Sequence, residues 1–402
     1  MHGADATATG MTQPARPVSG RTLAALATLG GAAFCFVTGE NLPVGLLPEL
    51  SSGLHVSISE VGLLVTMYAV VVVAVSAPLT HLTGRVGRRP LLCGLLGVFA
   101  LATLAASAAP SYGWLAAARV ATALAQSVFW SILAVVAAGL VPRQLRGRAI
   151  AGVFAGSSLA LILGVPAGTW LGQQAGWRLP FLVLSGVGAL GLASVALLLP
   201  PSASAEGRAR PGPHPDARRY RLTVVTTILA VTASFASYTY VTAFLTRVTR
   251  LPLGAVAPIL LLTGVADALG ILATGLLTDR YPRAVRVGPV ALLAAALLGI
   301  SLLATVGVAV VALQVCAGLG LSGVAIVMQS HVLEVAPRRT DIASAWYSAS
   351  FNVGIAVGPL VGGLVLSTLG LRFTPLVGGG IALLALGVIL AEARASRIPI
   401  SG

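Results

Sequence analysis

The stretch Ser57–Pro90, SISEVGLLVTMYAVVVVAVSAPLTHLTGRVGRRP, decides the fold class, because a long apolar run leads directly into a short loop rich in arginine. The apolar part, Ser57–Leu79, is long enough to cross a membrane, since a membrane-spanning helix needs roughly 20 mostly apolar residues. The loop after it carries Arg85, Arg88 and Arg89, and such clusters are typical of the cytoplasmic ends of membrane spans. The stretch therefore predicts a membrane helix with a cytoplasmic end.

The same rule applied along the chain predicts twelve spans, so we expect an all-α polytopic membrane protein. The first span follows Arg16 and Arg21, but it is too long for a signal peptide and lacks a clear small-residue cleavage site. We therefore expect it to be retained. The predicted spans are Thr22–Leu46, Ser57–Leu79, Leu91–Ala109, Gly113–Val141, Ala149–Gly172, Leu179–Leu199, Leu222–Leu245, Gly254–Leu277, Val287–Ala304, Val308–Val335, Ile342–Leu369 and Thr374–Glu392.

The composition agrees with a membrane protein. Of 402 residues, 57% are hydrophobic and 9% are charged, whereas soluble domains carry about 25% charged residues. The net charge of +14 comes from arginines in short groups between apolar runs, so it indicates membrane topology rather than nucleic-acid binding. The chain has no lysine, which excludes a P-loop. Its three cysteines stand singly in apolar segments and predict neither disulfides nor a metal site.

The arginines also predict the orientation. With the N-terminus inside, 20 arginines lie on the cytoplasmic side, and four lie outside: Arg178, Arg247, Arg250 and Arg372. Because positive charge favours the cytoplasmic side, we expect both termini there, in a bacterial cytoplasmic membrane.

The chain is predicted to contain an internal repeat. Pro142 after the fourth span and Pro337 after the tenth are 195 residues apart, and so are Gly84 and Asp279. The repeat predicts two pseudo-symmetric six-helix bundles, the architecture of one large class of secondary transporters. The predicted segments are an N-terminal tail (1–21), a first bundle (22–199), a flexible linker (200–221), a second bundle (222–392) and a C-terminal tail (393–402).

The loops after the second and eighth spans share a motif. They read THLTGRVGRRP from Thr80 and GLLTDRYPR from Gly275. Both resemble the G-x-x-x-D-R-x-G-R-R motif of the major facilitator superfamily, which implies a twelve-helix transporter whose loops couple the two halves as it changes its facing. Thr80 and Gly84 depart from the motif, so any acidic latch is expected at Asp279. The predicted coupling residues are Arg85, Gly87, Arg88, Arg89, Gly275, Asp279 and Arg280.

Spans five and eleven carry small residues at every fourth position, which lets helix backbones approach closely. The pattern resembles the Gly-Pro signature of the superfamily's drug:proton antiporters, although ordinary close packing would also explain it. The predicted packing residues are Gly164, Pro166, Gly168, Gly354, Gly358, Pro359 and Gly362.

Parts of the first half resemble bacterial sugar, arabinose and purine-nucleoside efflux permeases. The resemblance lies in ENLPVGLLPE (Glu40–Glu49), in VGLLVT (Val61–Thr66) and in GVPAGTWLG (Gly164–Gly172). It implies export of a small molecule without identifying the substrate.

Three charged residues lie inside predicted spans, where they are rare and by default functional. Glu40 and Arg119 lie at similar depths in spans one and four, so we expect them either to pair across the central cavity, where Glu40 would exchange a proton, or to form a static contact. Asp267, near the middle of span eight, is predicted either as a second proton site or as a structural hydrogen-bonding residue.

Two helix faces predict walls of a substrate cavity. Gln126 and Trp130 follow Arg119 on one face of span four, and Tyr238 and Thr242 share a face of span seven. Aromatic and hydrogen-bonding side chains suit a small-molecule site, although buried packing explains each of them equally well.

The function predicted from these features is proton-coupled antiport that exports a drug, sugar or nucleoside. The alternative is import of a small metabolite by proton symport. His331 and Glu334 are predicted at a solvated helix end, and the sequence contains no HExxH or G-x-S-x-G motif, so we expect no enzyme, metal or cofactor. The expected partners are the substrate, protons and the lipid bilayer, without nucleic acid, and the expected functional unit is a monomer.

Overall fold

The computed structural model describes residues 19–142, 145–200, 215–278, 280–336 and 340–395. Within these ranges the chain is almost entirely helical and has no strand. The first half contains α1 (Gly20–Gly45), α2 (Leu47–Leu54), α3 (Ile58–Leu82), α4 (Arg88–Ser107), α5 (Tyr112–Gly139), α6 (Arg146–Leu159), α7 (Val165–Ala175) and α8 (Arg178–Leu198). The second contains α9 (Ala217–Tyr238), α10 (Val241–Ala243), α11 (Val256–Thr278), α12 (Pro282–Leu302), α13 (Gly307–Val335), α14 (Thr340–Thr368) and α15 (Thr374–Ala395).

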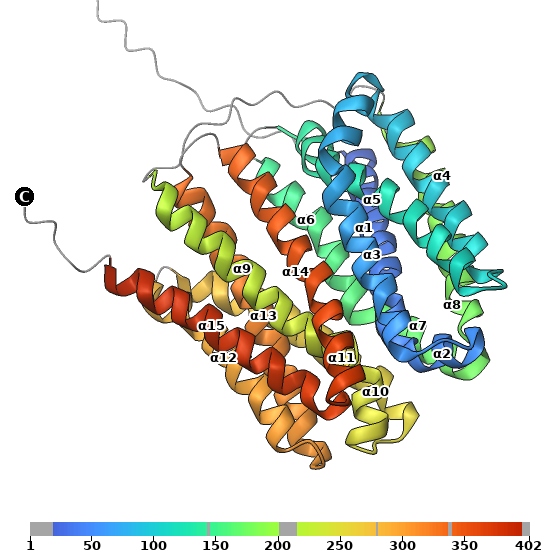
Figure 1. The fold of residues 1–402 in the computed structure, drawn as a ribbon. Coiled ribbons are helices and arrows are strands. Elements are labelled where there is room, and N and C mark those ends of the chain that lie inside the picture. Colours follow the sequence, from blue (N-terminus) through green and yellow to red (C-terminus); the bar gives the residue numbers. More distant parts are fainter. Residues whose placement is uncertain (1–18, 143–144, 201–214, 279, 337–339, 396–402) are drawn as a thin grey trace, which may run out of the picture.

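Twelve helical segments in the described residues are long and apolar enough to cross a membrane, and they match the twelve predicted spans. Figure 1 shows them as two groups, α1 to α8 and α9 to α15, each with six spans. The prediction of two pseudo-symmetric six-helix bundles is therefore confirmed.

Span five is less regular than the sequence predicts. It consists of α6 and α7 joined by one turn of π-helix, Ala160–Gly164. A second π turn, Phe244–Val248, ends span seven. π turns leave the ordinary hydrogen-bond ladder and are frequent at functional sites.

Side-chain caps set the beginnings of several helices. Ser57 accepts a hydrogen bond from the Glu60 backbone, and the Glu60 carboxylate accepts one from the Ser57 backbone, forming a capping box at α3. Ser111 caps α5, and Asp216 caps α9 by accepting from two backbone N–H groups. These caps satisfy donors that would otherwise lack partners at helix starts.

The small-residue stripes are packing surfaces. A Cβ atom added at Gly156 of α6 would lie 2.0 Å from the Gly30 carbonyl oxygen of α1, and one at Gly358 of α14 would lie 2.5 Å from the Phe235 Cβ atom of α9. The contacts of span five with α1 continue in register at Gly164, Gly168 and Gly172, and those of α14 with α9 continue at Gly354 and Gly362. Equivalent helix pairs thus pack alike in the two halves.

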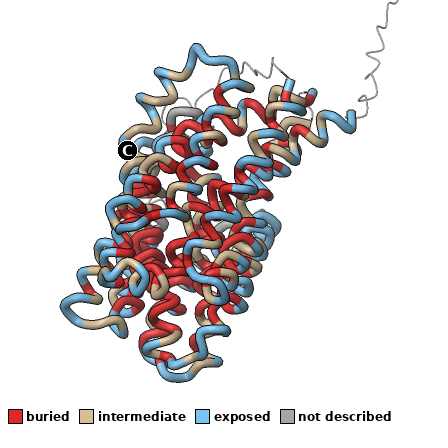
Figure 2. The backbone as a smooth tube through the Cα atoms, turned by 90° about the vertical axis from the view of Figure 1, so that its right-hand side faces the viewer, coloured by how far each residue is buried: buried red, intermediate tan, exposed pale blue. Residues whose placement is uncertain are grey.

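The two halves meet near the helix ends that carry few arginines, which we call the arginine-poor end. Three hydrogen bonds between described residues join them there: Ser59 Oγ to Gly363 O (3.4 Å), Thr66 Oγ1 to Ala356 O (2.9 Å) and Thr242 Oγ1 to Val44 O (2.9 Å). Tyr240, which donates to the Pro359 carbonyl oxygen, fills the space beside Gly62. Buried residues run through the interior of both bundles, while the loops at the two ends are largely exposed (Figure 2).

Candidate functional site

The carboxylate of Glu40 on α1 is held by an amide. Gln126 on α5 donates from Nε2 to Glu40 Oε2 at 2.8 Å, and its Oε1 accepts from the Tyr68 hydroxyl of α3 at 2.6 Å. Because a tyrosine hydroxyl has one proton, its donation to Oε1 fixes the orientation of the amide. Gln126 therefore connects α1 to α3, and its side chain is buried.

Arg119 contributes to the same site without forming an ion pair with the Glu40 carboxylate. Its guanidinium donates to two backbone carbonyl oxygens of α1, those of Gly39 and of Glu40, the latter at 2.9 Å. It also lies over the Tyr68 ring, 4.4 Å from the ring centroid. The predicted meeting of Glu40 and Arg119 thus occurs through the helix backbone.

Pro43 explains why α1 offers a carbonyl to Arg119. In an α-helix the carbonyl of Gly39 would accept from the N–H of the fourth residue after it, but proline has no N–H. Arg119, which is 3% exposed, supplies the missing donor. We call Glu40, Tyr68, Arg119 and Gln126 the Glu40 network.

A small pocket of about 10 Å³, about the size of one water molecule, adjoins the network inside the first half. It lies between α1, α4, α5 and α8, and the Nε atom of Arg119 has no hydrogen-bond partner among the described residues. The lining residues are Gly39, Ala102, Thr103, Ala106, Ala118, Arg119, Thr122 and Phe181.

Asp267 lies in the other half, apart from the Glu40 network. Its side chain on α11 packs against α13, where a Cβ atom added at Gly318 would lie 3.0 Å from Asp267 Oδ1. Tyr238 on α9 is within electrostatic range of the carboxyl group. No described residue forms a hydrogen bond or an ion pair with Asp267, so its predicted structural bonding has no partner in the part of the chain that the structure describes.

The other predicted cavity residues have different surroundings. The ring of Trp130 contacts Phe129 edge-to-face and Phe154 at a tilt, at centroid distances of 5.4 and 5.5 Å. Tyr238 is partly buried and contacts Phe235, whereas Thr242 is fully buried in the contact between the halves. Trp130 and Tyr238 thus remain candidates for the cavity wall, and Thr242 belongs to the interface.

The predicted coupling loop of the first half joins α3 to α4. Arg85 ends a short 3₁₀ turn and is exposed, Gly87 precedes α4, and Arg88 and Arg89 begin it. Arg89 donates to the Ala196 carbonyl oxygen of α8.

In the second half, Gly275 lies on α11 and Arg280 lies beside the Tyr281 ring, while Asp279 is outside the described residues. The predicted acidic latch therefore stays a prediction.

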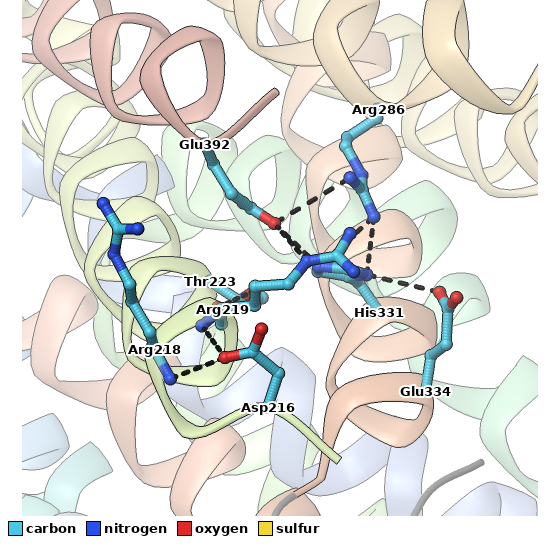
Figure 3. Close-up of polar contacts among 8 residues, drawn as sticks. All are labelled: Asp216, Arg218, Arg219, Thr223, Arg286, His331, Glu334 and Glu392. Carbon is cyan, nitrogen blue, oxygen red and sulfur yellow. Dashed lines mark hydrogen bonds and ion pairs between the residues drawn. The ribbon is translucent and has the colours of Figure 1, made fainter. Parts of the chain in front are cut away.

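The prediction of a solvated site at His331 is wrong. His331 is 5% exposed and contacts Arg286 of α12, Glu334 of α13 and Glu392 of α15, as Figure 3 shows. Glu334 is 47% exposed and is the solvated member of the group. Sequence reasoning failed here because Glu392 lies 61 residues farther along the chain.

Glu49 on the short helix α2 is a polar residue that sequence reasoning did not single out. Both carboxylate oxygens are buried without a hydrogen-bond partner among the described residues. This burial raises the pKa of the Glu49 carboxyl above its ordinary value.

Comparison with known proteins agrees with the fold and the motifs. The sequence pattern of the Major Facilitator Superfamily matches residues 29–287 and 226–400. A probable sugar efflux transporter of Mannheimia succiniciproducens is 34% identical over 381 residues, which cover 92% of this chain and 94% of the relative. The inner membrane transport protein YdhP of Escherichia coli is 34% identical over 379 residues, which cover 92% of this chain and 96% of the relative.

Solved structures share the architecture at low sequence identity. A bacterial homologue of the human lysosomal transporter Spinster, inward-facing and occupied, has a TM-score of 0.75 at 15% identity and covers 93% of this chain and 96% of its own. The nucleoside transporter NupG has a TM-score of 0.74 at 13% identity, and the match covers 92% of this chain and 99% of NupG. The motifs, the twelve spans and these relatives together show that the chain is a multi-pass membrane transporter that belongs to the Major Facilitator Superfamily.

Proposed function

We propose that this transporter exports a small organic molecule, such as a drug, sugar or nucleoside, in exchange for protons. The arginine-rich end, with both termini, faces the cytoplasm of a bacterial cell in this proposal. The observation that carries it is the Glu40 network, in which a partly buried carboxylate is held by a neutral amide and lies close to a guanidinium that bonds elsewhere.

The network can satisfy both protonation states of Glu40. The ionised carboxylate accepts from Gln126 Nε2, as observed. A protonated carboxyl can donate instead to Gln126 Oε1 after the amide turns by 180°, and the Tyr68 oxygen then accepts from Nε2. Protonation thus exchanges the donation from Tyr68 to Gln126 for a donation from Glu40, so it costs about one neutral hydrogen bond, that of the Tyr68 hydroxyl proton.

The proton and the substrate compete at this group. A charge inside a membrane protein is costly unless it is paired or hydrogen-bonded, so a substrate hydroxyl or amine that reaches Glu40 would favour its ionised form and release the proton. Arg119 supplies a fixed positive charge near the carboxylate. The name of the Mannheimia relative supports a hydroxyl-rich substrate within the proposed range.

Alternating access requires that the contact between the halves opens and closes. The bonds of Ser59, Thr66 and Thr242 close the arginine-poor end, which is the outer face in this proposal. Protonation of Glu40 from outside then requires these bonds to break.

The test follows proton movement in everted vesicles energised by respiration, across a panel of sugars, nucleosides and antibiotics. For an antiporter, adding the right substrate outside collapses the interior acidity, and Glu40→Gln abolishes the collapse. Glu60→Gln is the matched control, because Glu60 is exposed and outside the network. If instead only substrate loaded inside the vesicles collapses the gradient, the protein is an importing symporter. Proton movement that persists in Glu40→Gln would overturn the role of Glu40.

The same assay tests Asp267, which we propose as a second proton site. Asp267→Asn should slow proton movement, since no described residue pairs with this carboxyl group. Unchanged transport and coupling in Asp267→Asn would remove it from the mechanism.

A further inference from the structure

The pocket beside Arg119 combines a buried positive charge with two hydroxyl groups. Its volume is about 10 Å³, and it lies between α1, α4, α5 and α8. Arg119 and Thr122 line it from α5, Thr103 lines it from α4, and all three residues are buried. The remaining lining is apolar side chains and glycine, so these three polar residues decide what can bind there.

The guanidinium of Arg119 needs one more hydrogen-bond acceptor. Two of its three nitrogens donate to the backbone of α1, Nη1 to the Gly39 carbonyl oxygen and Nη2 to that of Glu40. The third, Nε, is buried and has no hydrogen-bond partner among the described residues. A buried donor without an acceptor is costly, and more so when the group is charged. The pocket that Arg119 lines is the place where such an acceptor can lie.

The two threonines of the pocket have already used their protons. Thr103 Oγ1 donates to the Phe99 carbonyl oxygen at 2.6 Å, and Thr122 Oγ1 donates to the Arg119 carbonyl oxygen at 2.8 Å. A hydroxyl group has one proton and two lone pairs, so each of these oxygens can still accept a hydrogen bond. Arginine can only donate. A ligand that satisfies all three residues must therefore accept one hydrogen bond and donate two.

We propose that the pocket is a binding site for one water molecule, which accepts from Arg119 Nε and donates to Thr103 Oγ1 and Thr122 Oγ1. Water has this balance of donors and acceptors, and about three hydrogen bonds are typical of a buried water. The volume of the pocket also suits a single water. The guanidinium would repel a cation, and a halide ion has no proton to donate to the two hydroxyl oxygens.

The bound water positions Arg119 within the Glu40 network. It joins α4 to α5 and satisfies the third guanidinium nitrogen without a carboxylate, so the positive charge of Arg119 is not neutralised by an ion pair. The guanidinium is then held by α1 through Nη1 and Nη2, by the water through Nε and by its contact with the Tyr68 ring. This site goes beyond the proposed function, because it does not depend on whether Glu40 exchanges a proton.

The experiment uses X-ray radiolysis of the protein in lipid nanodiscs, in which water molecules form hydroxyl radicals that label neighbouring side chains. Phe181 lines the pocket and is 1% exposed, so bulk water does not reach its ring. Phe129 is the reference, because it is equally buried and lies outside the lining. We expect Phe181 to be labelled several times more than Phe129.

Variants of one threonine test the predicted hydrogen bonds. Thr103→Val keeps the shape of the side chain and removes its oxygen, so the labelling of Phe181 should fall to that of Phe129, whereas Thr103→Ser should preserve it. Thr263→Val is the matched control, because Thr263 is buried and also donates to the carbonyl four residues earlier, but outside this pocket. Should Thr103→Val fail to fold, Thr122→Val decides.

Three results would overturn the water site. They are labelling of Phe181 no higher than that of Phe129, unchanged labelling of Phe181 in the folded valine variant, and an anomalous peak beside Arg119 Nε in bromide-soaked crystals, which would assign the pocket to an anion. Transport takes no part in these measurements. A failure of Glu40-dependent proton coupling therefore leaves them unaffected, and a dry pocket leaves the vesicle assay unaffected.

Discussion

Arg119 of α5 replaces the hydrogen-bond donor that Pro43 removes from α1. Proline at position 43 leaves the Gly39 carbonyl without an intrahelical partner, and the guanidinium of Arg119 bonds to it. A residue that would weaken an isolated helix thereby fixes the distance between two helices of the Glu40 network.

This relationship predicts non-additive effects on stability. Arg119→Gln should destabilise the protein by about 1–3 kcal/mol, the cost of an unsatisfied buried carbonyl. In a Pro43→Ala background the helix supplies its own N–H, so the same substitution should cost less. Denaturation of the two single variants and the double variant in detergent measures the coupling energy between the two positions. A coupling energy of zero would show that Arg119 does not supply the donor that Pro43 lacks.

Tyr68→Phe should slow coupled transport without abolishing it. The phenylalanine ring keeps the contact with Arg119, but Gln126 Oε1 loses its donor and the amide loses its fixed orientation. The loss of one neutral hydrogen bond, about 0.5–1.5 kcal/mol, corresponds to roughly a two- to tenfold lower rate. The vesicle assay measures it, with Tyr112→Phe as control, because Tyr112 bonds to a carbonyl outside the network. Equal effects of the two substitutions would assign Tyr68 to general packing.

A disulfide should lock the arginine-poor interface. A Cβ atom at Gly363 would lie 3.8 Å from the Ser59 Cβ atom, which is the usual separation across a disulfide. The Ser59→Cys/Gly363→Cys protein should form the bond under oxidation and lose transport, and dithiothreitol should restore it. Each single variant serves as control, because Gly363→Cys alone also crowds the Tyr240 hydroxyl. Full transport by the oxidised, cross-linked protein would show that this interface need not open.

Glu49→Gln should stabilise the protein at neutral pH. Because burial raises the pKa of Glu49, the folded state binds a proton more tightly than the unfolded state, and stability falls as pH rises through that range. The substitution removes this penalty, so the melting temperature should rise by about 1–2 °C at pH 8. The gain should shrink as the pH falls and disappear at about pH 3, which is below the ordinary glutamate pKa of about 4.3, so that the wild-type carboxyl is protonated in both states. A gain that does not depend on pH would point to packing instead.

The proposed orientation predicts opposite labelling of two exposed positions. In a background with Cys93 and Cys316 replaced by alanine, a membrane-impermeant maleimide added to intact cells should label Ala108→Cys at the arginine-poor end. It should not label Gly84→Cys until the cells are permeabilised. Both sites are exposed, and a Cβ atom at Gly84 meets nothing within 4 Å. The reverse pattern would invert the topology.

Hydropathy and the internal repeat predicted the fold because apolar length and arginine placement are local properties of the chain. Glu40, Gln126 and Arg119 could also be identified from the sequence. Charged residues are rare inside apolar spans, and helical spacing places Gln126 on the same face as Arg119. Tyr68 could not be identified in this way, because the sequence of an apolar helix does not show which residue a single tyrosine will bond to. His331 was misassigned because its burial depends on Arg219, Arg286 and Glu392, which three other helices bring together.

The contact of α1 with span five keeps one register along its length. Gly30, Leu42 and Leu46 lie against Gly156, Gly168 and Gly172, each pair 126 residues apart. Inserting or deleting one residue would rotate everything beyond it by about 100° and misplace the later contacts together. Variation of substrate range in such a transporter must therefore proceed by exchanging side chains within helices of constant length, with insertions confined to the loops.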